Sequence, residues 1–320
     1  MQNLINNYIS YEKNILNRGE GVIKTKKATL EQFYAYLHSQ YGVTIQVEEI
    51  SLQDCILFLE HYKNSIITRN GGSKGQFPQH NTCVEKMKNI KIFFEYASML
   101  GYKVLNYKML PKMKRENKKG KICSDYEYQI LKDGMTTKGW DEFIGMRNKL
   151  LVDIPYHTGL RRAEIARCKF SDFKTENNQF QIKRKGGYID PVFYGNKIKN
   201  LVLEYEKIIK IYLKGEGIVL DHDYIFFSLG NIKGRPLQPE AIAAIYRKCS
   251  LKLIEEGKLT RIIMPHMLRH SFATNCVYAG LSQQATTTLM GHRNPSTTMT
   301  YYHLNNTWLK EQYDKITVLN

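Results

Sequence analysis

The sequence predicts a mainly helical protein in two parts, with a small antiparallel sheet in the second part. Apolar residues recur at helical spacing on both sides of a basic stretch that has no periodicity of its own. Residues 180–194 instead alternate and contain Gly186 and Gly187, which is typical of a β-hairpin. We therefore expect a helical bundle over residues 1–110, a linker over residues 111–122, and a mainly helical domain with a C-terminal tail helix over residues 123–320.

Four helical segments are expected in the bundle. Leu30, Phe33 and Leu37 recur at helical spacing within residues 24–40, and residues 3–17 form a weaker pattern. The other two helices follow capping boxes at Ser51 with Asp54 and at Thr82 with Glu85, and Gly42 and Gly101 are the expected helix ends. Residues 70–75 have the composition of a flexible loop.

The second domain is expected to begin with a helix capped by Ser124 and Glu127. Residues 146–156 are apolar enough for a buried helix. Further helices are expected over residues 162–167, 201–213 and 239–257, with short helices and turns from His266 onward.

The formal charge of +17 and the pI of about 9.4 indicate a polyanionic partner, because a Lys or Arg that binds phosphate releases a condensed counterion. Nucleic acid is favoured over an anionic membrane surface, since basic residues are interleaved with aromatic ones throughout. Residues 1–8 lack the layout of a signal peptide, and no apolar run is long enough to cross a membrane. The six cysteines are scattered, which indicates reduced thiols in a cytoplasmic protein. We expect no metal and no cofactor.

Residues suited to phosphate chemistry are concentrated in the second domain. Tyr301 follows His292 by nine residues, and Arg161 and Arg269 each follow a leucine. Cleavage of a phosphodiester concentrates negative charge on the non-bridging oxygens. Arginine can stabilise that charge, because its planar fork donates two hydrogen bonds and stays protonated.

Three runs of sequence, residues 158–164, 266–270 and 291–301, together resemble the tyrosine recombinase (phage integrase) family. No pattern for an additional arm-binding domain precedes the first helix, so the chain looks like the simple two-domain, Xer-like type. The resemblance implies a SAM-like, core-binding N-terminal bundle and a catalytic C-terminal domain, which together clamp DNA.

The resemblance also implies a role for each site residue. Tyr301 would attack phosphorus and form a 3′-phosphotyrosine, His266 would take its proton, and Lys185 would protonate the leaving 5′ oxygen. Arg161, Arg269 and His292 would hold the phosphate, with Glu164 and His270 in support. The alternatives left open are Tyr302 for the nucleophile, Arg162 for the first arginine, and Lys183 or Arg184 for the hairpin residue.

The function implied is site-specific DNA recombination through a Holliday junction, in integration, excision or resolution. The expected partner is double-stranded DNA with paired inverted-repeat core sites, bound by a homotetramer or by a heterotetramer with a paralogue. The tail after Tyr301 would dock on a neighbouring protomer. The linker residues expected on DNA are Lys112, Lys114, Arg115, Lys118, Lys119 and Lys121. A type IB topoisomerase, a telomere resolvase and an inactive DNA-binding accessory protein are the alternatives.

Overall fold

The computed structural model describes residues 1–42, 45–66, 77–116, 121–136, 142–184, 187–229, 234–292 and 294–302. The chain divides into two compact units, Met1–Lys118 and Lys119–Asn320. None of the described helices is long and apolar enough to cross a membrane. The loop expected at residues 70–75 and the tail after Tyr302 lie outside the described residues.

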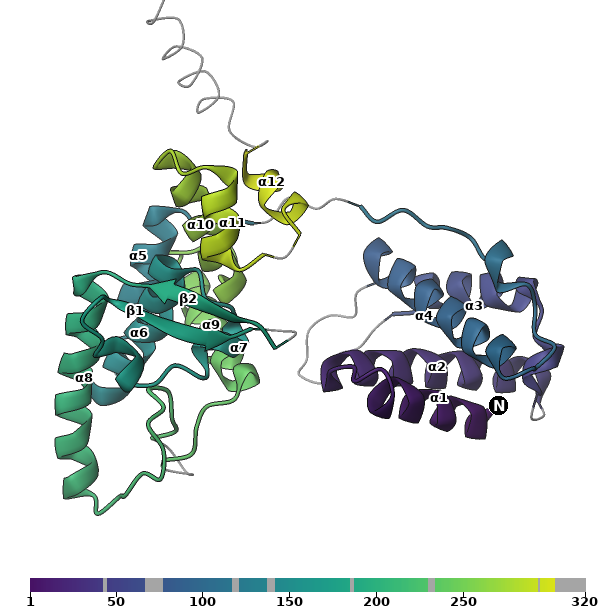
Figure 1. The fold of residues 1–320 in the computed structure, drawn as a ribbon, viewed down its shortest axis with the longest axis horizontal. Coiled ribbons are helices and arrows are strands. Elements are labelled where there is room, and N and C mark those ends of the chain that lie inside the picture. Colours follow the sequence, from purple (N-terminus) through teal and green to yellow (C-terminus); the bar gives the residue numbers. More distant parts are fainter. Residues whose placement is uncertain are drawn as a thin grey trace, which may run out of the picture. The chain divides into compact units, whose positions relative to one another are not determined.

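The first unit is helical and encloses one apolar core. Its helices are α1 (Gln2–Asn14), α2 (Glu20–Tyr41), α3 (Leu52–Asn64) and α4 (His80–Met99), with short 3₁₀ turns at Val47–Glu49 and Tyr107–Met109. Figure 1 shows α1 and α2 side by side. Aromatic rings fill the core: the Phe33 centroid lies 5.1 Å from Phe58 and 6.4 Å from Phe94.

Two capping predictions in this unit had different outcomes. Ser51 caps α3 as expected, because its hydroxyl accepts the Asp54 N–H at 3.2 Å while Asp54 accepts the Ser51 N–H at 2.8 Å. The start predicted at Thr82 was wrong, since α4 begins at His80 with Gln79 as its N-cap. The physical reason is that the Thr82 backbone N–H already donates to the Gln79 carbonyl at 2.9 Å, so Thr82 lies inside the first turn, and the Glu85 carboxylate pairs with Arg115.

The first half of the basic linker packs on the beginning of α4. Residues 111–116 form neither helix nor strand. Asn81 accepts the Glu116 N–H at 2.9 Å and donates to the Glu116 carbonyl at 3.0 Å, and His80 Nε2 lies 2.8 Å from the Lys114 carbonyl. These contacts hold this part of the linker to the first unit.

The second unit is mainly helical with a two-stranded antiparallel sheet, and that predicted fold class is confirmed (Figure 1). Its elements are α5 (Asp125–Gly134), α6 (Glu142–Thr158), α7 (Arg162–Ile165), the 3₁₀ turn Ser171–Phe173, β1 (Gln179–Lys183), β2 (Ile189–Phe193), α8 (Asn196–Gly215), α9 (Pro239–Glu255), α10 (Pro265–Tyr278), α11 (Gln283–Met290) and α12 (Ser296–Tyr302). The capping box at Ser124 and Glu127 forms as expected at the start of α5.

Helix α6 lies in the middle of the second core. Leu151, Val152 and Ile154 are fully buried on it, and it packs against α8 and α10. The sheet covers another part of this core through alternate residues of β1: Phe180 and Ile182 point inward, and Ile182 is paired with Asp190 of β2. The next inward position in this alternation is Arg184, which directly follows the last residue of β1 and is buried.

Candidate active site

The turn between α6 and α7 brings the first arginine to the site. Gly159 ends α6 with φ +66°, a left-handed conformation that favours glycine. Two residues later Arg161 is the N-cap of α7 and forms a capping box with Glu164. Glu164 accepts the Arg161 backbone N–H at 2.8 Å and its Nη1 at 2.9 Å. The Arg161 side chain is therefore held in place by its own helix, with 31% of it still exposed.

Helix α10 supplies the second arginine from the core side. Arg269 is 4% exposed and donates to the carbonyl oxygens of Gly159 and Met290. Its Nη1 lies 4.0 Å from Oε2 of Glu164. Burial and the positive charge of Arg161 lower the pKa of Arg269 to about 9, so the guanidinium stays protonated at neutral pH.

The C-terminal end of α11 is where the arginines meet. The carbonyl of Met290 accepts from Arg269, and the carbonyl of Gly291 accepts from Nη2 of Arg161 at 3.1 Å. Gly291 caps the helix with φ +56°. The last carbonyls of a helix carry partial negative charge and lack partners within the helix. They can therefore bind cations from other elements.

A third arginine, Arg184 at the end of β1, reaches the same end of α11. Its Nη1 donates to Met290 O at 3.2 Å and to Glu164 at 3.3 Å, and its Nη2 donates to Leu289 O at 3.4 Å. Sequence reasoning left Arg184 only as an alternative hairpin residue. The alternation of Phe180 and Ile182 would have placed it on the buried face.

Glu164 is the shared acceptor of this cluster. Burial by itself would raise the pKa of its carboxyl. The backbone N–H of Arg161 and the guanidinium groups of Arg184 and Arg161 outweigh that effect and lower the pKa. Glu164 is therefore ionised at neutral pH and orients two arginines.

The hydroxyl of Tyr301 is hydrogen-bonded with Nδ1 of His270. Tyr301 is 5% exposed and packs in a small cluster with Val277 and Met290. Burial raises the pKa of Tyr301, and the positive charge of Arg269 opposes that rise. Burial and the neighbouring His266 and Arg269 lower the pKa of His270 to about 4, so its ring is neutral and can accept a proton.

The two other histidines of the site have different surroundings. His292 Nδ1 lies 2.9 Å from the Thr298 hydroxyl, and burial with the charges of Arg269 and Arg161 lowers the pKa of His292 to about 3. When Thr298 donates to Nδ1, the neutral ring carries its proton on Nε2 and can donate there. His266 has an exposed side chain. Partial loss of solvent around the ring and the positive charge of Arg269 lower the pKa of His266.

Two of the alternative residues, Tyr302 and Arg162, make contacts of their own. The Tyr302 hydroxyl donates to the Leu281 carbonyl at 2.6 Å and lies 2.8 Å from the Thr286 hydroxyl. Arg162 pairs at 3.4 Å with Glu240, whose side chain is 79% exposed.

Several predicted residues remain to be placed relative to this cluster or lie on the linker. Lys185, Lys118 and Lys119 lie outside the described residues. The exposed linker residues are Lys112, Lys114, Arg115 and Lys121. Among the described residues, no group of three or more His, Cys, Asp or Glu side chains could hold a metal ion.

The phage integrase family model matches residues 127–307, which is more than half of the chain and includes every residue of the cluster. The chain belongs to the phage integrase family. The predicted family and the predicted enzyme class, a DNA breaking-and-rejoining tyrosine recombinase, are thereby confirmed, and site-specific recombination is favoured over the alternatives.

Full-length relatives and solved structures agree with this membership. The chain is 25% identical over 312 residues to the tyrosine recombinase XerC of Bacillus pumilus, covering 98% of this chain and 95% of the relative. It is 25% identical over 304 residues to XerC of Listeria monocytogenes, covering 89% and 96%.

Two solved structures share the fold. The XerH site-specific recombinase bound to palindromic difH substrate has a TM-score of 0.68 at 21% identity, covering 97% of this chain and 83% of that one. The Tn1549 transposon integrase in complex with circular intermediate DNA has a TM-score of 0.66 at 17% identity, covering 93% and 94%.

Proposed function

We propose that this phage integrase family member cuts and rejoins double-stranded DNA at specific sites through Tyr301. The observation that carries the proposal is the meeting of Arg161, Arg269 and the Tyr301–His270 pair around one end of α11. Cationic donors lie there beside a hydroxyl that is hydrogen-bonded with a neutral base. That combination suits attack on a phosphodiester.

In the cleavage step, the Tyr301 oxygen bonds to phosphorus while the bond from phosphorus to the 5′ oxygen breaks. The product is a 3′-phosphotyrosine and a free 5′ hydroxyl. Rejoining is the reverse attack by a 5′ hydroxyl, which restores the DNA linkage and frees Tyr301. The covalent bond conserves the energy of the phosphodiester, so the cycle needs no ATP.

The proton of Tyr301 needs an acceptor, because a tyrosine hydroxyl has a pKa of about 10 in water. The geometry favours His270 for this role, since its Nδ1 is hydrogen-bonded with the hydroxyl and its ring is neutral. This assignment revises the expectation for His266. His266 is exposed near Arg161 and Arg269, which suits a contact with the phosphate.

Charge on the non-bridging oxygens would be stabilised by Arg161, Arg269 and His292. The first two are held by Glu164 and by carbonyls of α11, so little reorganisation is needed when phosphate arrives. His292 would donate from Nε2. We keep Lys185 as the proposed donor to the 5′ oxygen, on the strength of the family resemblance alone.

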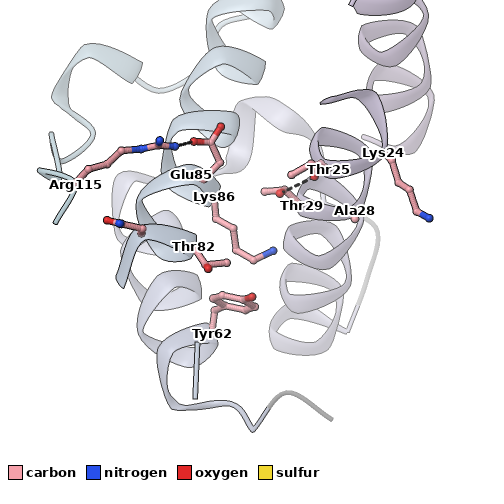
Figure 2. Close-up of a pocket in the computed structure, with 10 residues that line it drawn as sticks. Lys24, Thr25, Ala28, Thr29, Tyr62, Thr82, Glu85, Lys86 and Arg115 are labelled. Atoms are coloured by element: carbon pink, nitrogen blue, oxygen red, sulfur yellow. Dashed lines mark hydrogen bonds and ion pairs between the residues drawn. The ribbon is translucent and has the colours of Figure 1, made fainter. Parts of the chain in front are cut away.

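We propose that the first unit is the core-binding domain, and a basic hollow of about 550 Å³ between α2 and α4 supports this (Figure 2). Lys24, Lys86 and Arg115 line it together with Thr25 and Thr82, and so does Glu85, which pairs with Arg115. Lys86 is 6% exposed and lies 4.3 Å from the centroid of the Tyr62 ring. Cations and hydroxyl groups in one hollow suit a DNA phosphate.

The higher-order arrangement is also proposed. The enzyme would act as a homotetramer, or with a paralogue, on paired inverted-repeat sites, with its tail docked on a neighbour. Lys112, Lys114, Arg115, Lys118, Lys119 and Lys121 would contact DNA from the linker. A cytoplasmic location is in keeping with six free, buried cysteines. Sedimentation with one-site and two-site DNA would distinguish a tetramer from a monomer.

The cleavage proposal is tested on DNA that traps the covalent product. Duplexes would first be enriched from a random-sequence pool by binding to Tyr301→Phe protein, and then nicked at each position near their centre. A short 5′-hydroxyl fragment released next to a nick diffuses away, so the adduct accumulates and is seen on a denaturing gel. Wild type and Tyr302→Phe should form it and Tyr301→Phe should not. The absence of any wild-type adduct on every nicked duplex would refute the proposal.

A further inference from the structure

Arg184 is a buried cation on an element that was expected to face DNA. Its side chain is 4% exposed, and its backbone N–H donates to the Tyr188 carbonyl at 2.7 Å across the end of the hairpin. A hairpin arginine that bound DNA would extend into solvent. Arg184 turns the other way, into the protein, because it continues the inward alternation of β1.

The contacts of Arg184 are shared with the two phosphate-binding arginines. It donates to Glu164, which also accepts from Arg161, and to the carbonyl of Met290, which also accepts from Arg269. Its Nε lies 2.9 Å from Oδ2 of Asp190 on β2. Arg184 thus joins both strands of the hairpin to the groups that orient Arg161 and Arg269.

The backbone of α11 is shaped around this side chain. A Cβ atom added to Gly291 would overlap the Arg184 guanidinium, and Gly291 has φ +56°. Glycine therefore meets two requirements at this position, the left-handed cap and the close approach of Arg184. The close approach of Arg184 to Gly291 occurs at the same end of α11 that binds Arg161 and Arg269.

The charges of the cluster are consistent with a supporting role. Arg161, Arg184 and Arg269 face the carboxylates of Glu164 and Asp190, which leaves one positive charge in excess for a phosphate. Removing Arg184 would leave Glu164 with one cation fewer. The carboxylate would then compete more strongly with the DNA phosphate for the guanidinium groups of Arg161 and Arg269.

We propose that Arg184 is a positioning residue for DNA cleavage. It ties the β1–β2 hairpin to Glu164 and to the end of α11, and so keeps Arg161 and Arg269 oriented for the phosphate. This inference rests on the proposed function. It concerns the rate of the cleavage step, since Arg184 itself has no exposed donor to add to DNA affinity.

The test separates binding from cleavage. Full-length Arg184→Gln, Arg184→Lys and wild type would be compared on the enriched, nicked duplex. The dissociation constant would come from fluorescence anisotropy, and the rate of adduct formation would be measured at saturating protein. We expect Arg184→Gln to lower the saturated rate about 100- to 1,000-fold, comparable with the loss of one transition-state donor. Its dissociation constant should change less than about 3-fold, because only buried contacts are lost.

Two comparisons make the result specific. Arg184→Lys keeps the charge and should recover about 10-fold of the lost rate, as a lysine can replace one of the shared hydrogen bonds. Arg167→Gln is the matched control: Arg167 is exposed and bonds the Lys183 carbonyl of the same hairpin from outside at 3.1 Å. It should cleave at the wild-type rate.

A double-mutant comparison of cleavage rates tests whether Arg184 acts through Glu164. A simple loss of stability would not produce the result expected. If Arg184 acts through Glu164, the double variant Arg184→Gln/Glu164→Gln should cleave far faster than the product of the two single effects predicts. Asp190→Asn is a milder change that leaves the buried contacts in place. It should lower the saturated rate about 3- to 10-fold, and a rate equal to that of wild type would count against the inference, which keeps it testable if Arg184→Gln does not fold.

Suppose that wild type cleaves DNA and that the rate of Arg184→Gln lies within 3-fold of the wild-type rate. This result would overturn the inference about Arg184 and leave the proposed function intact. Strictly multiplicative effects of Arg184→Gln and Glu164→Gln would overturn it as well. A wild type that forms no adduct would instead refute the proposed function.

Discussion

The hydroxyl of Tyr301 is hydrogen-bonded with Nδ1 of His270, and His270 lies one helical turn after His266 on α10. The two histidines share a face of the helix, because residues four apart are neighbours on a helix surface. The tyrosine oxygen is thus paired before any DNA is bound. Which histidine accepts its proton can be decided by substitution.

We predict that His270→Gln slows adduct formation about 100- to 10,000-fold, the usual contribution of a general base. His266→Gln should slow it less, because His266 is exposed and Tyr301 is bonded to the other ring. The measurement is the adduct rate at saturating protein across pH 6 to 9. A larger loss in His266→Gln would restore the assignment made from sequence.

Arg161→Lys should lower the cleavage rate about 100- to 1,000-fold with little change in DNA affinity, because a lysine cannot reproduce a bidentate donor. Arg162→Lys is the matched control on the adjacent residue. It loses one contact with the largely exposed Glu240, so its rate should stay within about 3-fold of wild type. Equal losses in the two variants would contradict the assignment of Arg161.

Gly159→Ala should destabilise the second unit by about 2–4 kcal/mol, from backbone strain and overpacking together. The added Cβ would lie 2.5 Å from the Phe272 ring, at a residue with φ +66°. Gly217 has φ +65° and nothing within 4 Å of the added Cβ, so Gly217→Ala should cost only about 1–2 kcal/mol of strain. Urea unfolding measures both, and equal losses would show that the packing around Gly159 is unimportant.

Stability of the second unit should fall as the pH drops below about 6.5, the ordinary pKa of histidine. The folded-state pKa of His270 is about 4 and that of His292 about 3, so between these values and 6.5 the unfolded chain binds more protons. Each histidine then costs at most about 2 kcal/mol at pH 5. The double variant His270→Gln/His292→Gln should lose less stability than wild type between pH 7.5 and pH 5. Parallel losses would count against buried neutral histidines.

The role of Lys185 is predicted to depend on the leaving group. Lys185→Ala should slow cleavage of ordinary DNA about 100- to 10,000-fold, as for the loss of a general acid. On DNA with sulfur at the 5′ bridging position, the variant should cleave almost as fast as wild type, since a thiol of pKa about 8.5 leaves without a donated proton. The same rescue in Lys183→Ala, and not in Lys185→Ala, would move the role to Lys183.

Two features that depend on interactions between neighbouring residues were predicted correctly from the sequence. The boxes at Ser51 and Ser124 depend on hydrogen bonds between residues three apart, and both formed as predicted. The contact between Arg161 and Glu164 also joins residues three apart. The capping box predicted at Thr82 did not form: α4 begins two residues earlier, and Glu85 pairs with Arg115, which is thirty residues away.

The sequence by itself predicted the helical fold class, because residue types at short, regular spacings indicate helices, and three separated runs of sequence carried the resemblance to the family. Tertiary structure decided which atoms meet. Arg184 reaches the carbonyl of Met290, 106 residues away, and Tyr301 meets His270 instead of His266. Such pairings depend on how β1, α10 and α11 pack together, and packing between distant elements leaves no periodic mark in the chain.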